Sequence, residues 1–158
     1  MEVTKIINTY SIDCDHVLNI HKVNTPIGDV YSAADDLYLY MVCFEDTKRM
    51  EKMIKTISKE LACKFVQGKN KIIEKFEDEL SSYFDGSLRK FTVPIKTIGS
   101  EFQKEVWNKM LDMPYGSTQT YSDLARALSR SASHSRAIGA ACGANAHVLI
   151  IPCHRVVA

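Results

Sequence analysis

The amino-acid sequence predicts an α/β part followed by a mostly α part. Runs rich in aromatic and apolar residues come first, and two segments with apolar residues at helical spacing follow them. From Ser100 onward the apolar residues recur at helical spacing, with short polar turns between them. We place a boundary just before Gly99 and expect two domains, residues 1–96 and 97–158.

The first part is expected to form a small antiparallel sheet covered by helices. Residues 17–23 and 30–44 have strand character, and the turn-like residues 25–29 separate them. Two amphipathic helices should pack on the sheet, and a short extended piece, residues 91–95, should lead to the boundary. The apolar faces of the helices are formed by Met50, Met53, Ile54, Ile57 and Leu61 and by Ile72, Ile73, Phe76, Leu80, Tyr83 and Phe84.

Three helices are expected in the second part. A capping box at Ser100 starts the first of them, and helical spacing predicts that its buried face consists of Phe102, Val106, Trp107, Met110 and Leu111. The other two, residues 120–128 and 135–144, are joined by a polar turn, which is the helix-turn-helix pattern of DNA-binding proteins. Gly139 and Gly143 each cost the last helix about 1 kcal/mol of helix propensity. We therefore expect one face of that helix to lie close to a neighbouring helix or to a nucleic-acid groove, or two different faces to lie close to both.

Composition and charge narrow the functional classes. The chain has 158 residues, 46% hydrophobic and 25% charged, as in a globular protein that buries a core. It has no apolar run near the about 20 residues that cross a bilayer and no signal-peptide layout, so we expect an intracellular protein with no membrane partner. The net charge of +1 argues against a strongly basic nucleic-acid coat but permits a local site. Five cysteines without a CxxC pair indicate reduced thiols.

The most specific segment is residues 149–156, Leu-Ile-Ile-Pro-Cys-His-Arg-Val. We expect its apolar start to be a buried strand, which Pro152 ends because proline cannot donate to a sheet ladder. Cys153 should then turn toward a surface or pocket. A thiol has a reference pKa of about 8.5, and an adjacent imidazole and cation make the thiolate more accessible. On these residues alone, Cys153 is either a nucleophile paired with His154 or a structural cysteine beside an incidental basic pair.

Together with earlier segments, this motif resembles the O6-alkylguanine-DNA alkyltransferases, the methylated-DNA–protein-cysteine methyltransferase family. The other segments that resemble family signatures are Thr25-Pro26-Ile27-Gly28, Tyr83-Phe84-x-Gly86, Gly99-Ser100-x-Phe102-Gln103-x-x-Val106-Trp107, Met113-Pro114-Tyr115-Gly116, Tyr121-x-x-Leu124-Ala125 and Arg136-Ala137-Ile138-Gly139. The resemblance covers nearly the whole chain. It implies an N-terminal ribonuclease-H-like α/β domain and a C-terminal winged-helix DNA-binding domain that holds the cysteine.

The resemblance also implies direct-reversal DNA repair in a single turnover. The protein would flip O6-alkylguanine, mainly O6-methylguanine and also O4-methylthymine among its substrates, out of double-stranded DNA and transfer the alkyl group irreversibly to Cys153. A stacked base cannot present its O6 substituent for in-line attack, so the base must be extruded. A soft thiolate suits attack on carbon, and the thioether product does not turn over. The alternatives are a relative that binds the lesion without transfer, an inactive truncated form without transfer, and a thiol hydrolase that turns over.

Catalytic roles follow from the resemblance. Cys153 is implied to be the alkyl acceptor, and His154, through a water, the base that removes its proton. Tyr121 is implied to crowd the phosphate of the flipped nucleotide and to donate a hydrogen bond to the purine. Asn145 is implied to tie the helix-turn-helix to the active-site segment. Taken singly, Tyr121 could equally be a core aromatic and Asn145 a left-handed helix cap.

The resemblance implies contacts with the minor groove of DNA through the last helix. Arg136 is implied to enter the duplex and fill the gap left by the base, although alone it could be a solvated residue of the first turn. Small residues on this helix allow close approach to the groove. They are Ala137, Gly139 and Ala140. Pro152 and Arg155 are given structural roles, Arg155 by pairing with main chain or a carboxylate.

Three further expectations complete the sequence interpretation. Family members normally continue with a Gly-rich loop and a helix whose glutamate orients the histidine, so the second domain is expected to be truncated at its C-terminal end. No cofactor or metal is expected, because Cys14, His16 and His21 leave the zinc site of some family members short of ligands. We expect a monomer, located in the nucleus if eukaryotic and in the cytoplasm if bacterial.

Overall fold

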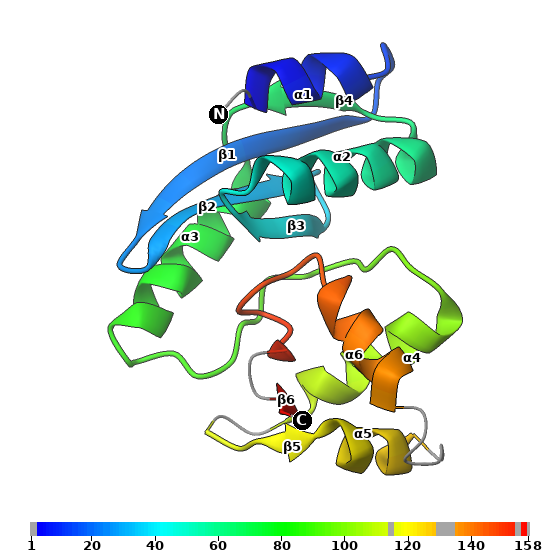
Figure 1. Ribbon diagram of the computed structural model, residues 1–158. Coiled ribbons are helices and arrows are strands. Elements are labelled where there is room, and N and C mark those ends of the chain that lie inside the picture. The colour runs from blue at the N-terminus through cyan, green and yellow to red at the C-terminus, as the bar shows by residue number, and fades with distance from the viewer. Residues whose placement is uncertain (1–2, 114–115, 129–134, 154–155, 158) are drawn as a thin grey trace. The chain divides into compact units, whose positions relative to one another are not determined.

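The structure, a computed structural model, describes residues 3–113, 116–128, 135–153 and 156–157. The chain forms two compact units, Met1–Ile98 and Gly99–Ala158 (Figure 1). The first unit contains a sheet with helices and the second consists mainly of short helices, so the predicted fold class is confirmed. No helix among these residues is both long and apolar enough to cross a membrane.

The sheet of the first unit has four strands in the order β3-β2-β1-β4. The strands β1 (Val17–Thr25), β2 (Gly28–Ala34) and β3 (Leu39–Phe44) form the expected antiparallel meander. Gly28 opens β2 with a φ of 126°, which residues with a side chain rarely adopt. The fourth strand, β4 (Lys64–Gln67), pairs with β1 in parallel and so requires a crossover, which the helix between β3 and β4 provides.

Asp35 organises the turn that divides the strand-like residues 30–44 into β2 and β3. Its Oδ1 accepts hydrogen bonds from the main-chain N–H groups of Leu37, at 2.9 Å, and Tyr38, at 2.8 Å. Its Oδ2 lies 3.0 Å from His16 Nε2 and accepts from the Tyr40 hydroxyl at 3.2 Å. Burial raises the pKa of Asp35, but these hydrogen bonds together lower it below its ordinary value.

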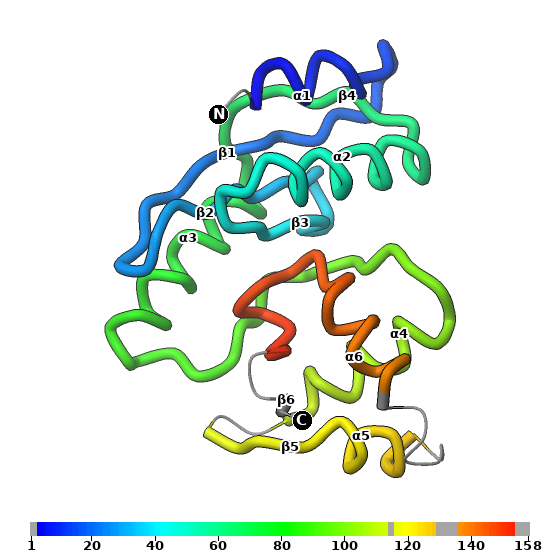
Figure 2. The backbone as a smooth tube through the Cα atoms, in the orientation of Figure 1, coloured from blue at the N-terminus to red at the C-terminus, as the bar shows by residue number. Residues whose placement is uncertain are grey.

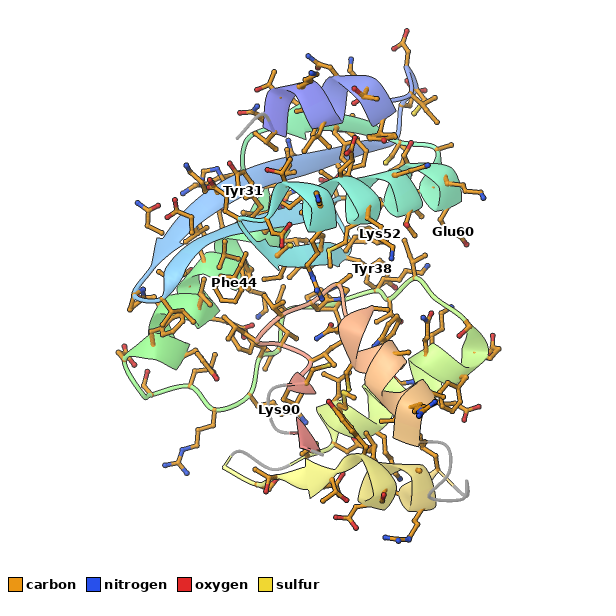
Figure 3. All side chains as sticks on the ribbon, viewed as in Figure 1. Tyr31, Tyr38, Phe44, Lys52, Glu60 and Lys90 are labelled. Carbon is orange, nitrogen blue, oxygen red and sulfur yellow. The ribbon has the colours of Figure 1, made fainter. Side chains whose placement is uncertain are left out.

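Three helices pack on the sheet: α1 (Val3–Tyr10), α2 (Thr47–Leu61) and α3 (Lys71–Phe84). Figure 3 labels Lys52 and Glu60, which belong to the exposed side of α2. α1 and α2 share one apolar core with the sheet, formed by Ile6, Ile7, Leu18, Ile20, Tyr31, Ala33, Tyr40, Met41, Cys43, Met50, Ile54, Ile57, Cys63 and Phe65. The buried residues of α3, which contacts β2, lie outside that core. Because both faces of β2 are covered, its last five residues are all buried instead of alternating.

α1 and β4 are elements of the first unit that the sequence pattern did not predict. α1 has eight residues, of which Ile6 and Ile7 are buried. In β4 only Phe65 is buried. Both segments are too short to show a clear periodicity, and β4 is a strand because it pairs with β1. The extended piece expected at residues 91–95 makes only one isolated bridge, from Ile95 to Leu39.

The second unit is built on α4 (Glu101–Leu111), α5 (Tyr121–Ala127) and α6 (Ser135–Gly143), which contact one another. α5 and α6 confirm the two helices of the expected helix-turn-helix pattern, while the polar turn expected between them, residues 129–134, lies outside the described residues. Their apolar side chains form a small core with the segment that follows α6. Its buried members are Val106, Trp107, Met110, Met113, Leu124, Ala125, Ile138, Ala141, Ile150 and Ile151.

Two features fix the beginnings of α4 and α5. Ser100 and Gln103 form the predicted capping box at α4, and Thr120 and Asp123 form a second one at α5. Gly99 allows α4 to start close to the core, because a Cβ atom there would lie 2.8 Å from Trp107 Cη2. Just before α5, the short strand β5 (Gln119–Thr120) pairs in parallel with β6 (Val156–Val157).

The prediction of a buried strand at residues 149–151 was wrong. After α6 the chain forms an irregular turn (Figure 2), in which the N–H of Ile151 donates to the carbonyl of His147 at 3.0 Å. Leu149 has a φ of 70°, in the left-handed region, which a strand does not contain. A short apolar run indicates burial, and Ile150 and Ile151 are buried, but it does not distinguish a strand from a tightly wound turn.

Candidate functional site

Cys153 lies at the end of this turn, where several segments of the second unit meet. The preceding Pro152 is buried, and the Cys153 side chain is half-buried. The N–H of Cys153 donates to the carbonyl of Ile151 at 2.8 Å, so the chain turns sharply at Pro152. The expectation that the proline turns the cysteine out of the apolar run therefore agrees with the geometry, although the run is a turn and not a strand.

Asn145 joins the end of α6 to Cys153. Its Nδ2 donates to the carbonyl of Ile151 at 3.0 Å and to Sγ of Cys153 at 3.2 Å. Its Oδ1 accepts from the N–H of His147 at 2.8 Å. Asn145 is 3% exposed and its φ is not positive, so it is not the left-handed helix cap that we considered as an alternative. A buried amide with three such bonds holds the turn and the thiol in one arrangement.

Helix α4 supplies two contacts that the sequence interpretation treated only as core. The Cys153 thiol donates to the thioether sulfur of Met110 at 3.3 Å. Trp107, one turn earlier on the same face, donates from Nε1 to the carbonyl of Ala141 in α6 at 2.9 Å, and this bond is buried. Helical spacing predicted that both side chains would be buried, but the sequence contains no signal for the atoms they contact.

Cys142, in the last turn of α6, is a member of the site that the sequence interpretation missed. Its thiol hydrogen-bonds with Cys153, and this bond lowers the pKa of Cys142, whereas burial raises it. The two thiols are both half-buried. The contact with Cys153 depends on how the turn folds back onto α6, and no pattern within either segment of the sequence indicates it.

Tyr121 lies against α6 and is not a fully buried core residue. It is the first residue of α5 and is half-buried, whereas Leu124 and Ala125 on the same helix are buried. A Cβ atom added to Gly139 would lie 3.9 Å from Cε2 of the Tyr121 ring. The ring therefore borders the face of α6 that carries this glycine.

α6 presents a basic and small-residue face to solvent. Arg136, Ala137 and Ala140 are exposed, Gly139 is half-buried, and the helix packs inward through the buried residues Ile138 and Ala141. A Cβ atom at Gly143 would meet no described atom within 4 Å, and one at Gly139 would make only an ordinary contact. α6 does contact α4 and α5, but among the described residues neither helix lies so close that it requires glycine at these two positions.

Two of the predicted site residues cannot be placed, and the described side chains form no metal site. His154 and Arg155 lie outside the described residues. In the described part of the chain there is no group of three or more His, Cys, Asp or Glu side chains placed to hold a metal ion. His16 instead lies 3.0 Å from Asp35 Oδ2, and His21 Nε2 lies 3.1 Å from the Glu77 carboxylate, so each of these imidazoles faces a carboxylate.

Comparisons with known proteins agree with this geometry. Residues 101–158 match the family model described as 6-O-methylguanine DNA methyltransferase, DNA binding domain. A methylated-DNA–protein-cysteine methyltransferase of Methanosarcina acetivorans is 34% identical over 133 residues, which cover 84% of this chain and 79% of that protein. The inducible methyltransferase of Bacillus subtilis is 42% identical over 85 residues, which cover 54% of this chain but only 47% of that protein.

Solved structures give the same result for the fold. The structure of Mycobacterium tuberculosis OGT in complex with DNA superimposes with a TM-score of 0.72 and 29% identity, over 88% of this chain and 78% of that one. The structure of M. tuberculosis O6-methylguanine methyltransferase gives a TM-score of 0.72 and 27% identity, over 89% and 78%. With its mixed α/β sheet unit, its helical DNA-binding unit and these relatives, the chain belongs to the methylated-DNA–protein-cysteine methyltransferase family, whose function is O6-methylguanine DNA repair by alkyl transfer to a cysteine.

Proposed function

We propose that this protein repairs O6-methylguanine in double-stranded DNA by transferring the methyl group to Sγ of Cys153. The observation that carries the proposal is the hydrogen bond from buried Asn145 to that sulfur. An N–H donor favours the thiolate over the neutral thiol, because it stabilises the negative charge. The same amide also holds the carbonyl of Ile151, so the sulfur is fixed in position before substrate arrives.

In the proposed reaction, the Cys153 thiolate attacks the methyl carbon and forms a C–S bond while the C–O6 bond breaks. The electron pair of that bond goes to O6 of guanine, and the purine takes up a proton as it leaves. Tyr121 is the proposed donor to the purine, and His154 is the proposed acceptor of the thiol proton. Water does not hydrolyse the S-methyl thioether at neutral pH, so each protein molecule reacts once. No cofactor takes part in this scheme.

We further propose that α6 enters the minor groove and that Arg136 fills the space left by the extruded base. Support comes from the exposure of Arg136, Ala137 and Ala140 and from the space at Gly143, where a Cβ atom would meet no described atom within 4 Å. Small residues permit close approach of a helix to the sugar-phosphate walls, and a cation that enters the duplex offsets part of the cost of unstacking. A monomer is sufficient for this arrangement, because one helix and one thiol serve one flipped base.

The first test is mass spectrometry after incubation with a duplex that bears O6-methylguanine. We expect the wild-type protein to gain one methyl group on the peptide that contains Cys153, in proportion to protein and without turnover. Cys153→Ser should gain none, while Cys14→Ser, a half-exposed cysteine of the other unit, should react like wild type. Lesion binding without a mass change would favour the lesion-binding alternative, and repeated turnover would favour a hydrolase.

The second test separates DNA binding from methyl transfer. Arg136→Ala should react more slowly than wild type with a methylated duplex but retain most of its reaction with free O6-benzylguanine, which needs no base extrusion. Arg126, which is exposed and lies 3.4 Å from Asp123 on α5, provides the matched control Arg126→Ala. Equal losses of Arg136→Ala on both substrates would contradict a role of Arg136 in extrusion.

A further inference from the structure

The two cysteines of the second unit meet at one place, although ten residues separate them in the chain. Asn145 contacts both residues. Its main-chain N–H donates to the carbonyl of Cys142 at 3.2 Å, and its side chain donates to Sγ of Cys153 at 3.2 Å. The two thiols also hydrogen-bond with each other. The turn thus holds a second sulfur beside the sulfur that we propose to accept the methyl group.

α4 supports this pairing from the other side. Trp107 holds α6 through the carbonyl of Ala141, the residue just before Cys142. Met110, one turn later on α4, contacts the Cys153 thiol. These two contacts come from adjacent turns of α4. The same helix therefore holds the main chain next to Cys142 and the sulfur of Cys153. Two thiols that hydrogen-bond with each other, on segments fixed by the same helix, can form a disulfide of about 2 Å after their side chains rotate toward each other.

The chemistry proposed for Cys153 also makes it vulnerable. A thiolate that attacks a methyl carbon also reacts with peroxides, and without a partner thiol it is oxidised further to sulfinic and sulfonic acids, which simple thiols do not reduce. A neighbouring thiol can intercept the first oxidation product. In a protein that reacts only once, irreversible oxidation of the acceptor removes the molecule from repair.

We propose that Cys142 is a resolving cysteine, which captures Cys153 as an intramolecular disulfide after oxidation by a peroxide. In the first step, the Cys153 thiolate attacks the peroxide O–O bond, becomes a sulfenic acid and releases water or an alcohol after protonation. In the second step, the Cys142 thiolate attacks that sulfur, forms the S–S bond and expels hydroxide, which leaves as water. A dithiol reductant then reduces the disulfide and returns both thiols.

The ionisation of Cys142 favours its part in the second step. In the reduced protein, its hydrogen bond with Cys153 lowers its pKa in spite of burial, so burial alone does not hold the Cys142 thiol in the neutral form. Cys43 and Cys63 in the other unit are buried, and burial raises the pKa of each to about 11. These two cysteines are poor attacking groups by comparison.

The inference rests on the proposed function for its biological meaning, but its test does not depend on methyl transfer. The full chain is treated with hydrogen peroxide, blocked with an alkylating agent, digested and analysed without reduction. We expect one cross-linked species that joins the Cys142 and Cys153 peptides, with the loss of two hydrogen atoms. Treatment with dithiothreitol should remove the cross-link and return the methyl-transfer activity of the treated wild-type protein to its untreated level.

The variants make the outcome decisive. In Cys142→Ser, the Cys153 peptide should gain two or three oxygen atoms, and dithiothreitol should not recover the activity that this variant had before treatment. Cys14→Ser should form the cross-link as wild type does. The inference is overturned if wild-type Cys153 is oxidised to stable acids without a link to Cys142, or if it links to another cysteine. If the cross-link forms but no methyl is ever transferred to Cys153, the proposed function fails and the redox pairing stands.

Discussion

The two units differ in the hydrogen-bond partners of their buried polar side chains. In the first unit, the buried polar residues are Ser32 and Ser58, and each hydroxyl donates to a main-chain carbonyl, that of His21 at 3.3 Å and that of Tyr10 at 2.6 Å. Among the described residues of the second unit, they are Asn145 and His147, and the Asn145 amide donates to the sulfur that we propose as the methyl acceptor. Side-chain hydrogen bonds of buried residues therefore fasten main-chain segments in one unit and also hold the proposed acceptor in the other.

One pair of asparagines makes this difference concrete. Asn70 caps α3 by accepting from the N–H of Ile73 at 3.0 Å and donates to the carbonyl of Ala34 at 2.9 Å. Asn145 likewise accepts from one main-chain N–H and donates to one carbonyl, but it also donates to Cys153. An asparagine side chain holds main-chain segments together in both units. In the second unit it also holds the Cys153 thiol. Replacement of Asn70 should thus affect methyl transfer only through stability.

The largest expected effect is a loss of stability in the apolar core of the first unit. Ile54 of α2 is fully buried, so Ile54→Ala should reduce the free energy of unfolding by about 2–5 kcal/mol. Hydrogen exchange of α2 amides would measure this loss, while the fluorescence of Trp107, the single tryptophan, reports on the second unit. Ile27→Ala, at an exposed site, is the control. If the Trp107 transition shifts equally, the units unfold together and the contrast drawn between them fails.

The next effect compares the two asparagines directly. Asn145→Leu leaves the N–H of His147 and the carbonyl of Ile151 without their partner, at a cost of about 1–3 kcal/mol. It should also slow the reaction of Cys153 with free O6-benzylguanine, because the sulfur loses its donor. Asn70→Leu should cost a similar amount of stability and leave that rate unchanged in the folded protein. Equal rates of reaction with O6-benzylguanine for both variants would show that Asn145 stabilises the fold but does not affect the reactivity of Cys153.

A smaller effect is expected at the start of α4. Ser100→Ala removes the cap of a helix that carries Trp107 and Met110, and helix caps are worth about 1 kcal/mol. We expect a thermal denaturation midpoint a few degrees lower, seen in Trp107 fluorescence. Ser100→Thr should restore most of the loss, because its hydroxyl can accept from the N–H of Gln103. A midpoint unchanged in Ser100→Ala would mean that packing alone fixes the start of α4.

The smallest expected effect is on how the stability of the first unit depends on pH in the acid range. The folded-state pKa of Asp35 is below its unfolded value, so its contribution is complete above about pH 4, the usual aspartate pKa, and is lost as pH falls through the folded pKa. The pKa of Tyr40 is raised to about 12, chiefly by burial, so its hydroxyl stays a donor throughout this range. Unfolding measured by hydrogen exchange should depend less on pH in Asp35→Asn. Asp36→Asn, the exposed neighbour, controls for the loss of one charge.

Several elements could be predicted from the sequence because their signals are local. The helices α2 and α3 and the capping box of Ser100 and Gln103 depend on spacing within one segment, and the structure agrees with each. The segments α1 and β4 carry too few buried residues for such a signal. The apolar run at residues 149–151 suggested a strand and was misleading, because an apolar run indicates burial but does not specify backbone conformation.

The sequence by itself determined the family, the order of the two units and Cys153 as the candidate acceptor, because motifs and periodicity are properties of neighbouring residues. The resemblance also implied that Asn145 ties α6 to the segment of Cys153, and the structure shows the contact between them. Only the tertiary structure decided which other groups lie beside the sulfur. Met110 comes from α4 and Cys142 from the end of α6, and their contacts with Cys153 exist because the chain folds back after α6. Such contacts join residues that are distant along the chain, and no local pattern encodes a distance between them.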